Sequence, residues 1–69
     1  MDQQFHERVY TVRRRLGITQ QQAADKAGVS LSAWKNWESG ASIPRMDALL
    51  AIARVLQVSP NELTGWNEE

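Results

Sequence analysis

Glycine and proline divide this chain into short segments, and that division limits it to a fold of small elements. Four glycines and two prolines leave no uninterrupted stretch longer than 16 residues. Within the segments, apolar residues recur at spacings of three and four, the periodicity of an α-helix, and no segment alternates as a strand does. We therefore predict an all-α fold, a compact bundle of about five short helices, with residues 1–69 forming one domain.

Start and stop signals mark the ends of these helices. Thr19 and Gln22 form a capping box, Ser30 is a serine cap, and a second capping box begins at Ser59, with proline in its first turn. Gly17, Gly28 and Gly40 are stop signals. The residues predicted to face the core are Phe5, Val9, Val12, Leu16, Ala23, Ala24, Ala27, Ala33, Trp34, Trp37, Met46, Leu49, Ile52, Ala53, Leu56 and Leu63.

The stretch from Thr19 to Gly40 carries the most information about function. It predicts two helices of eight or nine residues joined by residues 28–30, a connection that suits a steep crossing angle rather than side-by-side packing. Ala24 allows a close approach, and Gly28 allows a positive φ in the turn. Trp34 and Trp37, one helical turn apart, anchor the second helix. This pattern is that of a helix-turn-helix.

The opposite side of the second helix is predicted to be exposed. At about 100° per residue it carries small, amide and basic side chains of the kinds that read base edges in the major groove. Asn36 suits adenine, Lys35 suits guanine, and Leu31 suits a thymine methyl group. An ordinary solvated helix face would explain the same residues. The predicted base contacts are Leu31, Ser32, Lys35 and Asn36.

Residues 9–66 resemble the Cro/repressor-type helix-turn-helix family, also called lambda-repressor-like or Xre. The likeness runs in one register through Arg13-x-x-Leu16-Gly17-Ile18-Thr19-Gln20, Ala24-x-x-Ala27-Gly28-Val29-Ser30, Trp34-x-x-Trp37-Glu38-x-Gly40 and Pro44-x-Met46-x-x-Leu49-x-x-Ile52-Ala53-x-x-Leu56-x-Val58-Ser59, and ends at Leu63. The resemblance implies a transcriptional regulator, with repressor as the preferred role, that binds a palindromic operator as a homodimer. It implies phosphate contacts by Gln20, Ser30, Ser39, Ser42 and Arg45, with Arg13 on a phosphate, paired with Glu38, or both.

The chain departs from the family pattern in two places. Alanine stands at position 23, where leucine is usual, and tryptophan at position 34, where isoleucine or valine is usual. Because the two volume changes oppose each other, we expect Trp34 to be buried against Ala23, although an ordinary core aromatic fits equally well. The loop of residues 41–43 has no basic residue, which weakens the expected grip on phosphates.

Charge separates along the chain, although its formal net charge is zero, which argues mildly against nucleic-acid binding. Residues 1–45 hold seven basic and four acidic residues, and residues 46–69 hold one and four. A basic end can face phosphates while the acidic end points away; solvated surface charges are the plainer explanation. We expect double-stranded DNA as the partner.

Composition narrows the remaining possibilities. With no cysteine and one histidine, His6, we expect no metal, no cofactor and no enzymatic site. No apolar run is long enough to span a membrane, so we expect a cytoplasmic protein. The predicted dimer interface is Leu63 and Trp66 at the C-terminal end; in the alternative, Trp66 folds onto its own core. A protein-interaction module, such as an antitoxin that also binds its operator, is the rival function.

Overall fold

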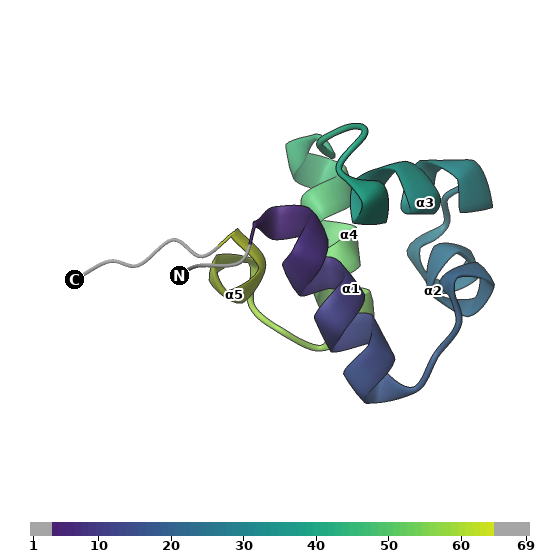
Figure 1. The fold of residues 1–69 in the computed structure, drawn as a ribbon, viewed down its shortest axis with the longest axis horizontal. Coiled ribbons are helices and arrows are strands. Elements are labelled where there is room, and N and C mark those ends of the chain that lie inside the picture. Colours follow the sequence, from purple (N-terminus) through teal and green to yellow (C-terminus); the bar gives the residue numbers. More distant parts are fainter. Residues whose placement is uncertain (1–3, 65–69) are drawn as a thin grey trace.

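A computed structural model describes residues 4–64. These residues form five helices joined by short turns, with no strand in the described range, so the predicted all-α fold is confirmed (Figure 1). The helices are α1 (Phe5–Leu16), α2 (Gln20–Ala27), α3 (Leu31–Ser39), α4 (Met46–Leu56) and α5 (Pro60–Thr64).

The predicted start signals are present as hydrogen bonds. At α2 the Gln22 backbone N–H donates to Thr19 Oγ1 over 3.0 Å, and the Thr19 backbone N–H donates to the Gln22 side chain over 2.9 Å. At α3 the Ala33 N–H donates to Ser30 Oγ over 3.1 Å. Each bond satisfies a backbone donor that the first turn of a helix leaves unpaired. The sequence therefore fixes the beginnings of the two central helices locally.

The helix ends follow the predicted glycines with one addition. Gly17, Gly28 and Gly40 have φ angles of 77°, 73° and 85°, in the left-handed region. The end of α4 also needs this conformation, but there Gln57 adopts it, with φ 62°. Sequence reasoning missed this end because glutamine carries no stop signal.

The core gathers residues from all five helices. Its largest fully buried side chains are Trp34, Ile52, Leu56, Leu63 and Val9. In Figure 1, α3 lies at the upper right, where it packs against α1 and α2, and α2 lies below it on the right side. The exposed face of α3 therefore points away from the rest of the bundle.

Two residues predicted to be buried are not. Met46 is 67% exposed and Leu16 is 38% exposed. Met46 is the first residue of α4 and Leu16 is the last residue of α1, so each lies at a helix end beyond the neighbours that could cover it. The predictions were wrong because helical spacing gives the face of a residue, not how far the neighbouring helices extend.

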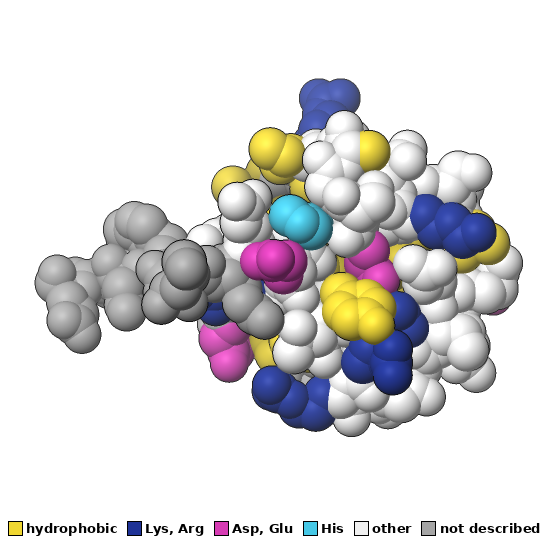
Figure 2. Space-filling model, in the orientation of Figure 1, with side chains coloured by type: hydrophobic (Ala, Val, Ile, Leu, Met, Phe, Trp, Pro, Cys, Tyr) yellow, Lys and Arg dark blue, Asp and Glu magenta, His cyan; other side chains and the backbone are white. Residues whose placement is uncertain are grey.

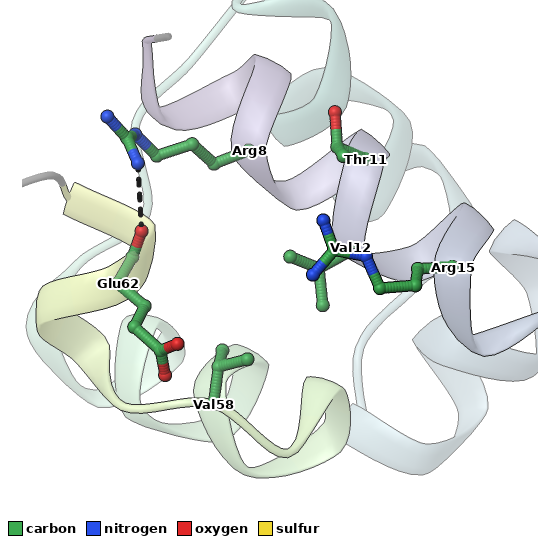
Figure 3. A pocket seen from close by; sticks show the side chains of 6 residues that line it. All are labelled: Arg8, Thr11, Val12, Arg15, Val58 and Glu62. Atoms are coloured by element: carbon green, nitrogen blue, oxygen red, sulfur yellow. Dashed lines mark hydrogen bonds between the residues drawn. The ribbon is translucent and has the colours of Figure 1, made fainter. Parts of the chain in front are cut away.

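Helix α5 packs against α1 and leaves a shallow hollow between them. Figure 3 shows Arg8, Val12 and Arg15 of α1 on one side of the hollow, and Val58 and Glu62 on the other. Arg8 Nη1 donates to the Glu62 carbonyl oxygen over 3.4 Å, a long hydrogen bond. Leu63 of α5 is fully buried in the core.

Candidate DNA interface

The turn between α2 and α3 has the geometry that the sequence predicted. Gly28 ends α2, and the Val29 N–H reaches back to the Ala24 carbonyl oxygen over 3.0 Å. A Cβ atom at position 28 would meet no atom within 4 Å, so glycine is favoured there by its positive φ rather than by lack of space. Ser30 is the N-cap residue of α3, so only residues 28–30 separate the two helices.

Helix α3 has one buried and one exposed face, as predicted. Trp34 is fully buried and Trp37 is 9% exposed, and their rings meet edge to face with centroids 6.2 Å apart. The four predicted base-contacting residues occupy the other face: Ser32, Lys35 and Asn36 are exposed, and Leu31 is half-buried. The described part of the chain offers no ion-pair partner to Lys35, so its ammonium group is available to a ligand.

Glu38, at the inner end of α3, accepts hydrogen bonds from three helices. Arg13 of α1 donates from Nε to Glu38 Oε2 over 2.5 Å and from Nη2 to Oε1 over 3.1 Å. Gln20 of α2 donates from Nε2 to Oε1 over 3.1 Å, and Trp34 donates its indole N–H to Oε2 over 2.5 Å. We call these four residues the Glu38 cluster. Together they join α1 to the two helices of the helix-turn-helix.

The cluster decides between the two roles considered for Arg13. The expected pairing with Glu38 is confirmed, and the remaining Nη1 donates to the Ile18 carbonyl oxygen over 2.8 Å. Arg13 is only 7% exposed. Its predicted contact with a DNA phosphate is therefore wrong: the guanidinium group is already surrounded by protein acceptors and has almost no accessible surface.

The other predicted phosphate contacts lie in and around the helix-turn-helix with their side chains at least partly accessible. Ser30, Ser39, Ser42 and Arg45 are exposed, and Gln20 is half-buried. Ser39 already donates its hydroxyl to the Asn36 carbonyl oxygen over 3.2 Å, so it would have to exchange that bond for one to a phosphate. Arg45 alone among these residues brings a positive charge.

The structure describes only one of the two residues predicted to form the dimer interface. Leu63 has no exposed surface and cannot contact a second copy, so this prediction was wrong: α5 turns its leucine into the core. Trp66 lies outside the described residues. Sequence reasoning missed the exposed apolar residues Ile43, Met46 and Leu50, which are 85%, 67% and 50% exposed. Their spacing of three and four was the available signal, but it also fits a buried stripe.

The described residues show neither a metal site nor a membrane-spanning helix. No group of three or more His, Asp or Glu side chains in residues 4–64 could hold a metal ion, and no helix there is long and apolar enough to cross a membrane. In Figure 2 the basic side chains of the face shown lie in several separate places.

Five short helices, a tight turn between α2 and α3 and an Arg13–Glu38 pair across the bundle define a Cro/repressor-type helix-turn-helix domain. The Helix-turn-helix family model matches residues 9–63. The chain belongs to this family.

Individual relatives agree with this assignment. The chain is 42% identical over 59 residues to the cryptic phage CTXphi transcriptional repressor RstR of Vibrio cholerae, covering 86% of this chain and 53% of that protein. It is 34% identical over 65 residues to the HTH-type transcriptional activator BcrR of Enterococcus faecalis, covering 94% of this chain and 32% of that protein. The chain thus spans about half, or less, of the length of these curated relatives.

A solved structure shares the whole arrangement. The P22 c2 repressor, crystallised with a synthetic operator, matches with a TM-score of 0.87 and 35% sequence identity, covering 91% of this chain and 96% of that one. The fold prediction is therefore confirmed by a relative as well as by the helices themselves.

Proposed function

We propose that this chain is a sequence-specific DNA-binding regulator of transcription that acts as a repressor, with α3 lying in the major groove. One observation carries the proposal: the outer face of α3 presents Ser32, Lys35 and Asn36 without covering structure, while its inner face is fixed by buried groups. The P22 c2 repressor, which has the same fold, was crystallised with its operator, and RstR is named a repressor. Both likenesses support the proposal.

Each exposed side chain of α3 has a chemical role in base reading. The Asn36 amide can donate to and accept from adenine at once, and the Lys35 ammonium group can donate to guanine O6 and N7. Ser32 can bond to several base edges, and Leu31, half-buried at the start of the helix, can contact a thymine methyl group. These contacts specify the sequence.

The proposed phosphate contacts set the position of the helix without reading sequence. Gln20 begins α2, where backbone N–H groups and the helix dipole favour an anion. Arg45 is the N-cap residue of α4, at the end of the loop that follows α3. The residues proposed to contact phosphates are Gln20, Ser30, Ser39, Ser42 and Arg45.

Selection of binding sites from random duplex DNA, followed by titration of two variants, tests this docking. Asn36→Ala should lose about 1–3 kcal/mol of binding free energy on the selected site and relax one base pair. Arg45→Ala should weaken binding on all sequences alike and lower the slope of log affinity against log salt by about one. If Asn36→Ala weakened every sequence equally, α3 would not read bases through this residue.

We propose that the operator is palindromic and that two copies bind it, because one helix-turn-helix reads only a few base pairs. With Leu63 buried, two candidate surfaces remain for the contact between copies. One is Trp66. The other is the apolar patch of Ile43, Met46 and Leu50, which adjoins the proposed phosphate contact Arg45. Apolar side chains can meet their own symmetry mates across a two-fold axis, which like charges cannot.

Sedimentation with and without a selected operator tests the dimer. We expect two copies per operator and cooperative binding, lost either in Trp66→Ala or in the double variant Met46→Ser with Leu50→Ser. The variant that loses cooperativity identifies the surface. Independent binding of single copies by the native protein would refute the dimer, and full cooperativity in both variants would refute both surfaces.

A protein-interaction module is the second candidate function. The exposed apolar patch favours it, as does a net charge of zero, since DNA-binding domains are usually basic. Such a module would show no salt-dependent affinity for random duplex DNA, whereas a DNA-binding domain releases counterions on binding and must show it.

A further inference from the structure

Trp34 supplies the fourth hydrogen bond to Glu38, and the family resemblance does not account for this bond. The arginine–glutamate pair belongs to the pattern of the family, but the position of Trp34 is usually isoleucine or valine, which have no donor. In this chain the indole N–H of Trp34 takes one of the four places on the carboxylate. Because Trp34 has no exposed surface, its N–H has no water to replace that bond.

The four bonds divide evenly between the two carboxylate oxygens. Oε2 accepts from Trp34 and from Arg13 Nε, and Oε1 accepts from Gln20 and from Arg13 Nη2. Trp34 and Glu38 belong to the same helix, so their bond does not join two elements. Instead, the bond fixes the orientation of the carboxylate group, with Oε2 facing α3 and Oε1 facing Gln20 of α2.

We infer that Trp34 is a positioning residue of the DNA interface: through Glu38 it holds Gln20, and with it the start of α2, in a fixed relation to the reading face of α3. This inference rests on the proposed function. A specific complex needs phosphate and base contacts to fit at the same time, within a fraction of an ångström. A non-specific complex needs only the phosphates. Loosening the Glu38 cluster should therefore weaken operator binding more than binding to random DNA.

Phenylalanine variants at the two neighbouring tryptophans make a matched test. Trp34→Phe keeps a large apolar ring but removes the indole donor together with the volume of the five-membered ring. Trp37→Phe makes the same change on a ring in edge contact with the first, whose indole N–H has no acceptor among the residues that the structure describes. The measured quantity is the ratio of dissociation constants for random and selected duplexes, at one salt concentration and at a temperature where circular dichroism shows both variants folded.

We expect Trp34→Phe to lower this ratio about tenfold, the scale of one hydrogen bond to a charged group, and Trp37→Phe to change it by less than about twofold. Adding Gln20→Ala should then cost less in the Trp34→Phe protein than in the native protein, because the two residues act through one carboxylate. Equal ratios for the two phenylalanine variants, or full additivity with Gln20→Ala, would overturn the inference. Native protein without preference for any selected site would instead refute the proposed function.

A measurement on the native protein covers the case in which Trp34→Phe fails to fold. In a ¹H–¹⁵N spectrum the indole cross-peak of Trp34 should shift when the selected operator is added, because a phosphate at Gln20 changes the bonds on Glu38. The Trp37 cross-peak is the internal reference. A Trp34 cross-peak that does not move on saturation with operator would overturn the inference.

Discussion

Helices α3 and α5 both pack against α1, but different interactions hold them there. Helix α3 is joined to α1 by the buried Arg13–Glu38 pair and its further donors. Helix α5 is held by the burial of Leu63, with one long hydrogen bond from Arg8 beside it. Apolar burial is non-directional, whereas hydrogen bonds to a carboxylate fix an orientation. The helix proposed to enter DNA is thus held to α1 by directional bonds to a buried carboxylate.

The strongest test of this comparison removes one large side chain from each helix. Trp34→Ala should lower the free energy of unfolding by about 3–5 kcal/mol, through the cavity and the lost bond to Glu38. A single core of this size supplies about that much in total, so the variant should be largely unfolded at room temperature. Urea denaturation followed by circular dichroism measures both.

Leu63→Ala is the counterpart on α5, with an expected loss of about 2–5 kcal/mol from a buried leucine. Because α5 is a single short helix at the end of the described residues, it can shift to fill part of the cavity, which places the loss at the lower end. A loss from Leu63→Ala as large as that from Trp34→Ala would show that both helices depend on packing alone.

Features of the fold that depend on residues close together in the sequence could be predicted. The caps at Thr19 and Ser30, and the left-handed glycines 17, 28 and 40, depend on contacts within one or two turns, so they could be predicted. The two faces of α3 followed from helical spacing alone. The same spacing could not show that Leu16 and Met46 are exposed, because that depends on where other helices end.

The candidate site divides in the same way. The exposure of Ser32, Lys35 and Asn36 followed from spacing. The role of Arg13 could not be decided, because both a phosphate and Glu38 are acceptors for a guanidinium group. Only the three-dimensional arrangement shows that Ile18 and Glu38 together occupy it. The indole bond from Trp34 was also out of reach, since the sequence predicted burial but no partner.

Arg13→Ala tests the polar side of the comparison. It leaves the buried Glu38 carboxylate with only Gln20 and Trp34 as donors. Breaking a buried ion pair in this way lowers the free energy of unfolding by about 3–5 kcal/mol. Because Gln20 is only half-buried, water near it should keep the loss close to about 3 kcal/mol. The double variant Arg13→Met with Glu38→Leu removes both charges and should recover part of the loss, because it still leaves the buried Trp34 indole N–H without an acceptor. Thermal denaturation of the three proteins gives the comparison; a double variant less stable than Arg13→Ala would contradict it.

The smallest expected effect compares alanine substitutions at the two glycines that flank α3. It separates the cost of backbone conformation from the cost of a close contact. Gly28 and Gly40 both have positive φ, so alanine at either position should cost about 1–2 kcal/mol. At Gly28 the added Cβ meets no atom, but at Gly40 it lies 3.2 Å from His6 Nδ1 of α1. Gly40→Ala should therefore lower the free energy of unfolding more than Gly28→Ala, because it also pushes the end of α3 away from α1. His6→Ala combined with Gly40→Ala removes the ring and should bring the loss at position 40 down to that at position 28. If Gly40→Ala were no worse than Gly28→Ala in urea denaturation, the approach of α3 to α1 at this end would be loose, and the Glu38 cluster would be the main contact that orients α3.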